Sequence, residues 1–385
     1  MGTNRRDFIK YVVAGSIAAG CPVDLSLLAA ETSPQPAVEG EDNRICHQVR
    51  DGKVFTLPPA TAHHDIVIVG GGVSGLTAAY LTRHLNFLLL EKEPHWGGNA
   101  YLMEYDGNAF ATGSAFLTKS EPAAFSFAKE IGLEPLPVHD RDATIIQGEW
   151  IPNTWTDGLD KLPYPATVRE GFKKFKKEIL AIDVAKRSKE LDNIPFSSFM
   201  KGFPAEVKEW WDNYGPSNWG ATSEQTAARL AIDELQDIGS DEIPDFYTWS
   251  GGLGAITKRL ADLLQPNFAD GMLSGATTVA VVPGKKEVQV TYMHGAELKT
   301  VTARAVVMAT PKFITRRIVQ GLPEKQSDAM HKIHYIPYPV SETNLPHLHV
   351  AASVSPPNAV LPPSPHAAPR EFPCWWSTPA LPSRC

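Results

Sequence analysis

Apolar and glycine positions follow a definite order between residues 65 and 100. Four β-branched residues follow Asp65 in the run DIVIV, which predicts a short strand buried on both faces. Glycines come next, and LTAAYLTR then has apolar residues at helical spacing. A second apolar run, FLLL, ends at Glu91. This order predicts a strand, a helix and a second strand, the βαβ unit of a parallel sheet.

Three further stretches have periodic apolar positions. Arg169–Leu191 predicts one amphipathic helix with a solvated, lysine-rich face. A glycine turn leads into a second helix within Trp249–Asn267. Glu287–Ala303 predicts a hairpin, and Ala305–Pro311 predicts a buried strand that ends at the proline.

The periodic pattern stops near Tyr338. From Pro339 to Cys385 the chain has 11 prolines in 47 residues, no glycine, no lysine and no helix or strand period. Such a composition cannot easily bury a core and predicts disorder. A natural proline-rich tail and a shifted reading frame both account for the change, and we favour the shifted frame.

The N-terminal residues predict a targeting segment. Arg5 and Arg6 precede an aspartate, two apolar residues and Lys10, and an Ala- and Gly-rich run, Tyr11–Gly20, follows that is short for a membrane span. This pattern resembles the twin-arginine signal, which would direct the folded protein to that export machinery and to the periplasm. The alternatives are an ordinary amphipathic start and a short membrane anchor. The sequence IAAGC also leaves open a lipid anchor on Cys21, as in a lipoprotein.

Composition excludes several classes of protein. Charged residues make up 21 % of the chain, hydrophobic residues 43 %, and the formal net charge is −7, as in ordinary globular proteins. The net charge is negative and the lysine-rich face of Arg169–Leu191 is interpreted as solvated surface, so we expect no nucleic-acid partner. The four cysteines lack metal-ligand spacing, so we expect no metal site. His63 and His64 are expected in a solvated loop before the first strand.

The glycines after the first strand have the spacing G-x-G-x-x-G. Gly70 allows a tight turn, Gly72 lets a pyrophosphate approach the backbone, and Gly75 permits close packing of the helix on the strand. The start of the helix offers amide hydrogens and partial positive charge to the phosphates. Glu91 ends the second strand and can accept hydrogen bonds from both ribose hydroxyls. The motif predicts a dinucleotide site and by itself does not separate FAD from NAD.

The stretch continues to a second glycine pair, Gly97-Gly98, and as a whole it resembles the flavin amine oxidase superfamily. That group includes monoamine oxidases, polyamine oxidases, protoporphyrinogen oxidase and phytoene desaturases. The resemblance covers about residues 65–337 and implies FAD as the cofactor. It also implies an α/β fold, with a Rossmann-like FAD-binding domain and an inserted α+β substrate domain. An arginine usually follows the glycine pair, and Asn99 stands there in this chain, so we expect phosphate binding to rely more on backbone amides.

The resemblance also assigns residues to the cofactor site. It implies that the loop FATGSAFL reaches the flavin region and that Val279 holds the adenine through its backbone. It also implies that the residues Ala309, Thr310 and Pro311 lie near the dinucleotide. No catalytic residue is assigned, because in flavoenzymes the cofactor carries the chemistry. The residues expected to contact FAD are Gly70, Gly72, Val73, Ser74, Gly75, Glu91, Lys92, Gly97, Gly98, Asn99, Gly113, Ser114, Val279, Ala309, Thr310 and Pro311.

The expected domain organisation follows from the same resemblance. The family's second half supplies a late glycine-containing motif at the flavin, and it would begin where the composition changes, so we expect the C-terminal half to be incomplete through truncation or a frame shift. The expected parts are a signal peptide at 1–30, an arm at 31–64, an FAD-binding domain at 65–115 and 250–337, a substrate domain at 116–249 and a tail at 338–385.

Three functions stay open on the sequence alone. The first is an FAD-dependent oxidoreductase of the amine-oxidase type, which moves a hydride from a C–N or C–C bond of a small molecule to flavin N5. Amines, polyenes and porphyrinogens are the substrate classes considered. The second is a catalytically inactive dinucleotide-binding remnant. The third is an NAD-binding dehydrogenase, and the second glycine pair counts against it.

Overall fold

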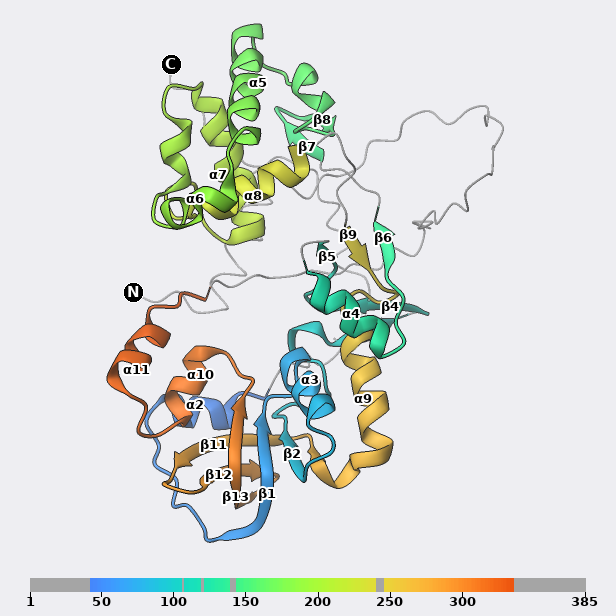
Figure 1. Cartoon of the computed structure of the whole chain (residues 1–385), viewed down its shortest axis with the longest axis vertical. Helices are drawn as coiled ribbons and strands as arrows, with labels where there is room; N and C mark the ends of the chain where they lie inside the picture. The colour runs from blue at the N-terminus through green and yellow to red at the C-terminus, as the bar shows by residue number, and fades with distance from the viewer. Residues whose placement is uncertain (1–41, 106, 119–120, 139–142, 240–245, 336–385) are drawn as a thin grey trace, which may run out of the picture. The chain divides into compact units, whose positions relative to one another are not determined.

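The computed structural model describes residues 42–105, 107–118, 121–138, 143–239 and 246–335 (Figure 1). The chain divides into two units, Met1–Arg44 and Ile45–Cys385, and all elements from β1 onward belong to the second. The predicted signal peptide with Cys21 and the predicted tail lie outside the described residues. None of the helices in the described ranges is long and apolar enough to cross a membrane.

A six-stranded sheet with the order β10-β2-β1-β13-β12-β11 contains the predicted βαβ unit, which is confirmed. Figure 1 shows β1 and β13 side by side. The two strands are far apart in the sequence, since the Thr61 hydroxyl on β1 donates a hydrogen bond to the carbonyl oxygen of Thr300 on β13, 239 positions later. The parallel strands are β1 (Ala60–Val69), β2 (Phe87–Leu90), β10 (Met272–Leu273) and β13 (Glu297–Met308). The antiparallel strands are β11 (Ala276–Pro283) and β12 (Val288–His294).

Alternating side chains of β1 and β2 fill a core on each face of the sheet. On one face, Ile66, Ile68 and Leu89 pack with helices α3 (Val73–Leu81) and α9 (Gly254–Phe268). On the other face, Val67 and Val69 pack with β11, β12 and helix α10 (Lys312–Ile318). Burial of both faces explains why these strands are unbroken apolar runs in the sequence.

Two strands differ from their predicted extents. The expectation of a loop at His63 and His64 is wrong, because β1 begins before them and His63 is in register with Thr302 of β13. The strand predicted at Ala305–Pro311 is the end of β13, so it continues the predicted hairpin. The prediction of a buried strand ending at the proline is wrong, because β13 ends at Met308, Ala305 is exposed and residues 306–308 are half-buried. Among the described residues, β12 pairs with β13 only as far as Ala303, while β1 pairs with it to its end.

Residues 143–239 form a core of their own, rich in aromatic side chains. Trp155, Phe172, Phe175 and Trp211 are at most 2 % exposed in it. The segment begins with the hairpin β7 (Ala143–Ile146) and β8 (Glu149–Pro152). Its helices are α5 (Ala166–Leu180), α6 (Val184–Leu191), α7 (Ala205–Trp219) and α8 (Ala228–Gly239).

The prediction of one helix over Arg169–Leu191 is wrong, because α5 and α6 are separate helices. The break lies at Asp183, whose carboxylate accepts a hydrogen bond from the backbone N–H of Lys186 at 3.0 Å and caps α6. The spacing predicts an apolar stripe of Phe172, Phe175, Ile179, Ile182 and Val184. The first three are each 1 % exposed on α5, whereas Ile182 and Val184 lie beyond the end of that helix and are half-buried.

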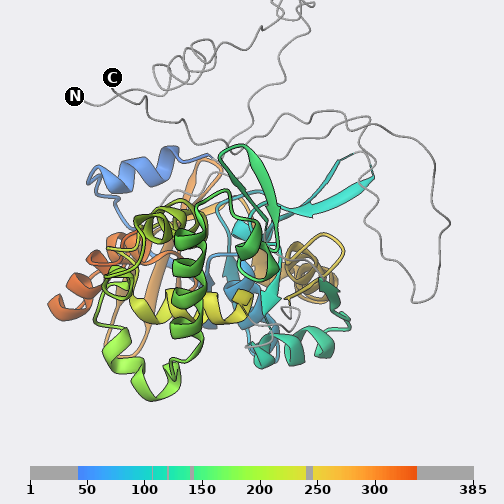
Figure 2. The same ribbon diagram turned by 90° about the horizontal axis from the view of Figure 1, so that it is seen from above.

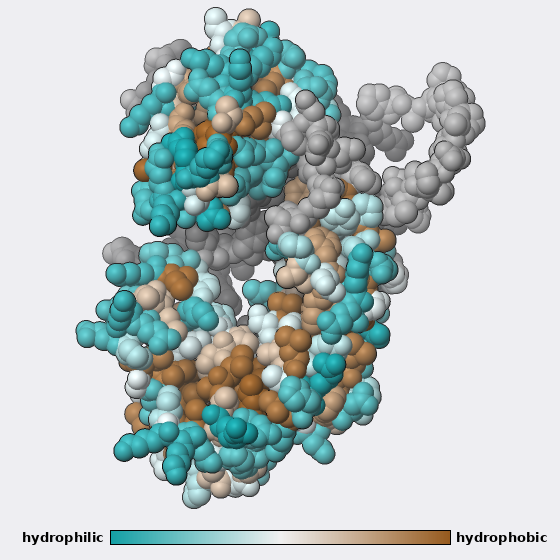
Figure 3. Space-filling model, viewed as in Figure 1, coloured by the Kyte–Doolittle hydropathy of each residue, from teal (hydrophilic) through white to brown (hydrophobic). Residues whose placement is uncertain are grey.

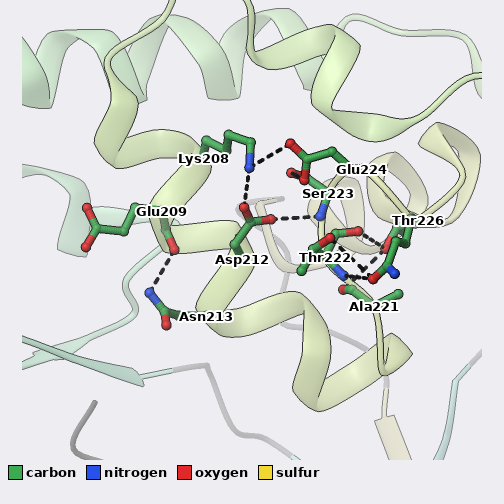
Figure 4. Close-up of polar contacts among 10 residues, drawn as sticks. Lys208, Glu209, Asp212, Asn213, Ala221, Thr222, Ser223, Glu224 and Thr226 are labelled. Carbon is green, nitrogen blue, oxygen red and sulfur yellow. Dashed lines mark hydrogen bonds and ion pairs between the residues drawn. The ribbon is translucent and has the colours of Figure 1, made fainter. Parts of the chain in front are cut away.

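A polar cluster joins α7 to the segment before α8 (Figure 4). Lys208 pairs with Asp212 one turn along α7 and with Glu224 at 2.9 Å. Asp212 Oδ1 also accepts a hydrogen bond from the backbone N–H of Ser223 at 2.7 Å. Ser223 is fully buried, so this carboxylate satisfies a backbone donor that solvent cannot reach.

Short elements complete the description. The hairpin of β3 (Leu102–Tyr105) and β4 (Asn108–Ala111) is a separate two-stranded ribbon in Figure 2, and most of its residues are exposed. Strand β9 (Phe246–Thr248) pairs with β5 (Leu117–Thr118) and with β6 (Leu136–Val138). In the described part of the chain the remaining α-helices are α2 (Arg44–Arg50), α4 (Pro122–Glu130) and α11 (Glu324–His331), so the predicted arm contains α2 and part of β1. The predicted domain boundaries stay a prediction.

Candidate cofactor site

The glycine-rich turn lies at the carboxyl end of β1, the edge at which parallel α/β sheets bind ligands. Figure 3 shows apolar side chains gathered over this part of the sheet, around β1 and β13. Gly70 has a φ of 107°, and a Cβ there would lie 2.7 Å from the Ala309 carbonyl oxygen. A Cβ on Gly75 would lie 1.7 Å from the Gly70 carbonyl oxygen. The packing of the protein itself therefore requires both glycines.

Gly72 has a different environment. Its φ of −75° and ψ of −172° are accessible to every residue type. A Cβ built there would meet only ordinary contacts, the Gly97 carbonyl oxygen and Gly98 Cα, both at 3.8 Å. The fold thus has room for a side chain at Gly72. The missing side chain leaves space at the motif position where a pyrophosphate approaches the backbone.

The second glycine pair lies directly against this turn. The Gly97 N–H donates to the Gly71 carbonyl oxygen at 2.9 Å, and Gly72 and Gly97 form a parallel bridge. Gly97 and Gly98 have φ values of 132° and 56°, which favour glycine. The structure therefore brings together the two loops that the sequence assigns to the dinucleotide.

Glu91 is 7 % exposed, and backbone groups orient its carboxylate. Oε2 accepts a hydrogen bond from the Gly71 N–H at 2.6 Å, and Oε1 accepts one from the Glu93 N–H at 2.8 Å. The Glu91 carbonyl oxygen accepts from the Ala276 N–H at 2.7 Å, which joins β11 to the site. Each carboxylate oxygen has a second lone pair, so each can also accept a bond from a ribose hydroxyl.

The loop FATGSAFL lies between the second glycine pair and the start of α9. A Cβ on Gly113 would lie 2.9 Å from the Asn99 carbonyl oxygen, and the Thr112 hydroxyl donates to the same oxygen at 3.4 Å. The Ser114 carbonyl oxygen accepts a hydrogen bond from the Leu253 N–H at 3.1 Å. The predicted contacts Asn99, Gly113 and Ser114 are therefore neighbours.

Ala309 and Thr310 lie against the first turn. The Ala309 N–H donates to the Val69 carbonyl oxygen at 2.9 Å, and Thr310 Cγ2 is 3.3 Å from the Cβ position of Gly70. Pro311 precedes α10 as its N-cap residue.

The other predicted residues are more dispersed. Val73 and Ser74 are exposed in the first turn of α3, and Lys92 pairs with Glu93. Val279 lies three residues beyond Ala276, where the register of β11 with β12 shifts. That these residues contact FAD stays a prediction. Within the described residues, no group of three His, Cys, Asp or Glu side chains could hold a metal ion.

The sequence reasoning missed Gly71 and Trp96. Gly71 uses its N–H on Glu91 and its carbonyl oxygen on Gly97. A Cβ on Gly71 would lie 2.6 Å from Cε3 of Trp96, so the indole ring lies against this glycine. The signal was the middle glycine of GGG, which the G-x-G-x-x-G motif leaves unspecified.

Comparisons with known proteins agree with this geometry. The family model of flavin containing amine oxidoreductases matches residues 73–340. Chloroplastic protoporphyrinogen oxidase 1 of Spinacia oleracea is 25 % identical over 326 residues, which are 71 % of this chain and 55 % of that protein. Flavin-containing amine oxidase B of Cavia porcellus is 36 % identical over 84 residues, 21 % of this chain and 16 % of that one.

A solved structure supports the fold. Wild-type putrescine oxidase bound to putrescine has a TM-score of 0.54 and 20 % identity, covering 71 % of this chain and 64 % of that chain. The chain therefore spans about half the length of the plant relative and under two thirds of the solved structure.

Proposed function

This chain belongs to the flavin-containing amine oxidoreductase family, with FAD as its cofactor, and from that premise we propose that it is an oxidoreductase of the amine-oxidase type. Its proposed substrate is a small molecule that loses a hydride from a C–N bond, or from a C–C bond in a polyene or porphyrinogen. The names of the relatives, an amine oxidase and a protoporphyrinogen oxidase, support these classes. FAD supplies the hydride acceptor, N5, when it is bound.

The observation that carries the proposal is the space at Gly72. Gly70 and Gly75 cannot carry a Cβ without a clash with backbone atoms, so they would be glycines in a purely structural turn as well. Gly72 meets no such restriction, and its nearest potential contacts are at 3.8 Å. A ligand that approaches the backbone accounts for a glycine at this position.

Backbone groups hold the dinucleotide in this proposal. The first N–H groups of α3 have no intrahelical acceptors and, with the helix dipole, attract the pyrophosphate. Asn99 stands where the family usually has an arginine and carries no charge, so these backbone amides bind the phosphates without help from a cation. Glu91 accepts the ribose hydroxyls, and its negative charge disfavours a 2′-phosphate.

We assign substrate binding to residues 116–249 as an inserted α+β domain. The separate aromatic core of residues 143–239 supports this assignment. So does the pairing of β5 with β9, Leu117 opposite Tyr247, because it places the two ends of the segment next to each other.

Absorbance of the purified chain tests cofactor binding and activity separately. We expect flavin bands near one FAD per chain, and loss of the oxidised-flavin band when an amine or a porphyrinogen is added without oxygen. A folded, colourless protein that gains no band after incubation with FAD would contradict the proposal. A flavin band that no candidate substrate bleaches would refute the oxidase activity and leave FAD binding intact. Titration of the chain with NAD is the control, because binding of NAD in place of FAD would favour the alternative of an NAD-binding dehydrogenase.

We also propose export by the twin-arginine pathway to the periplasm, with lipid on Cys21 as an additional modification. The pattern of Arg5, Arg6 and Lys10 before an apolar run supports this route. Replacement of both arginines by lysine should keep the chain in the cytoplasm of a bacterium that has the pathway, and Cys21→Ala should remove lipid label. A wild-type chain found only in the cytoplasmic fraction would contradict export.

A further inference from the structure

We propose that Trp96 is a positioning residue for the cofactor, because it forms the third side of a clamp on Gly71. The clamp fixes the backbone at Gly71 and so sets where the next residue, Gly72, meets the pyrophosphate. This inference rests on the FAD binding proposed above.

The clamp holds Gly71 through three different contacts. Its N–H donates to Glu91 Oε2 at 2.6 Å, and its carbonyl oxygen accepts from the Gly97 N–H at 2.9 Å. Its remaining face lies against the Trp96 ring, since a Cβ there would be 2.6 Å from Cε3 and 2.9 Å from Cζ3. The peptide groups on both sides of Gly71 therefore have little freedom to rotate.

All three contacts come from one short segment, residues 91–97. Glu91 is buried at its start, and the Gly97 N–H lies at its end. Trp96 is anchored because it packs against the core cluster that contains Ile66 and Ile68. The indole thus connects the phosphate-binding turn to the rigid core beneath it.

The position of this backbone matters because amides do most of the phosphate binding in this site. Asn99 brings no cation to compensate for a misplaced N–H. Hydrogen bonds prefer donor angles above about 150° and weaken steeply below about 120°, so a rotation at Gly71 that turns the Gly72 N–H away from the pyrophosphate lowers the affinity for FAD. A flat, rigid aromatic ring restricts such rotation better than a flexible aliphatic side chain.

Three substitutions at Trp96 and one control test the clamp. The variants are Trp96→Ala, Trp96→Leu and Trp96→Phe, and the control is Trp150→Ala, an indole that is 66 % exposed on β8. Two quantities are measured on the full chain without cofactor: the Kd for added FAD, and hydrogen exchange in the peptide spanning residues 69–77. We expect about 10-fold weaker FAD binding and about 10-fold faster exchange for Trp96→Ala, the size of one lost aromatic contact. For Trp96→Phe, the Kd and the exchange rate should stay within about 3-fold of the wild-type values. Trp150→Ala should have the wild-type values of both.

The outcomes separate positioning from a purely structural role. Trp96→Ala with an unchanged Kd for FAD overturns the inference, even if its Tm falls, because a structural residue would lower only stability. Unchanged exchange in residues 69–77 overturns it as well. If Trp96→Ala does not fold, Trp96→Leu keeps most of the volume without the flat ring and decides the matter by the same two measurements. A wild-type chain that binds no FAD refutes the proposed function, whereas the exchange measurement still decides whether Trp96 holds the turn.

Discussion

Replacing Gly72 by alanine should separate cofactor binding from the stability of the fold. The backbone at Gly72 has φ and ψ values of −75° and −172°, which alanine adopts without strain. The added Cβ would meet protein atoms only at 3.8 Å, an ordinary van der Waals distance. We therefore expect the variant without cofactor to be stabilised by about 0.4–1 kcal/mol, because alanine restricts the unfolded chain more than glycine does.

The same Cβ should weaken FAD binding, because it occupies the space that the pyrophosphate needs. An extra carbon in a closely packed contact costs about 1–3 kcal/mol. That penalty corresponds to about 5- to 150-fold weaker binding of FAD.

Thermal unfolding with and without FAD measures both effects. At a concentration of 100 times its Kd, FAD should stabilise the wild-type chain by about 2.7 kcal/mol. For Gly72→Ala at the same concentration, a tenfold weaker Kd would reduce this to about 1.4 kcal/mol. The control is Gly75→Ala, whose Cβ would lie 1.7 Å from the Gly70 carbonyl oxygen and should lower the Tm even without FAD. Full stabilisation of Gly72→Ala by FAD would refute the assignment of the space to the cofactor, and a lower Tm without FAD would refute the argument that the fold leaves that space open.

Three further predictions concern Glu91, Phe172 and Asp212. Glu91→Gln retains one acceptor oxygen for the two N–H groups of Gly71 and Glu93, so its free energy of unfolding in urea should be about 1–3 kcal/mol lower than that of the wild type. An unchanged unfolding midpoint would contradict the hydrogen bonds described. Phe172→Ala should cost about 3–5 kcal/mol in the same assay, because the ring is 1 % exposed, whereas Leu180→Ala, 40 % exposed on the same helix, should cost far less. Burial disfavours the charged form of Asp212, but the hydrogen bonds from Lys208 and from the Ser223 N–H outweigh it and lower its pKa below the ordinary 3.8. Its contribution to the free energy of unfolding is thus present above that value and is lost as the pH falls below it. Acid titration of urea unfolding should therefore show that Asp212→Asn loses less stability than the wild type below pH 3.8, and equal losses would contradict the described bonds.

The βαβ unit could be predicted because its signals are local. Each strand is a short apolar run, and the close contact that requires Gly75 is with Gly70, five positions earlier; Gly70 itself is also required by a distant contact, with the Ala309 carbonyl oxygen. The loops around Asn99, Gly113 and Ser114 could be assigned only through the family resemblance, since no local pattern shows that residues so distant in sequence become neighbours.

Other features depend on contacts that a linear pattern does not contain. The break between α5 and α6 depends on the Asp183 side chain bonding to the Lys186 N–H, while the apolar spacing continues through it. The packing of Trp96 against Gly71 connects positions 25 residues apart, and a periodic pattern gives Trp96 no role. The twin-arginine signal, the domain boundaries and the frame shift stay predictions.

The pairing of β1 with β13 has a consequence for the order of events during synthesis. Thr61 and Thr300 bond across these strands and are 239 positions apart, so the ribosome must add that many residues before β1 can meet its neighbour. At roughly 5–20 residues per second, the emerging apolar strand waits on the order of 10–50 s for β13. Residues 143–239 build their core from contacts within one continuous segment, and they can fold during that interval. The dinucleotide edge can therefore form, and FAD can be captured there, only after residues 297–308 have been added to the chain.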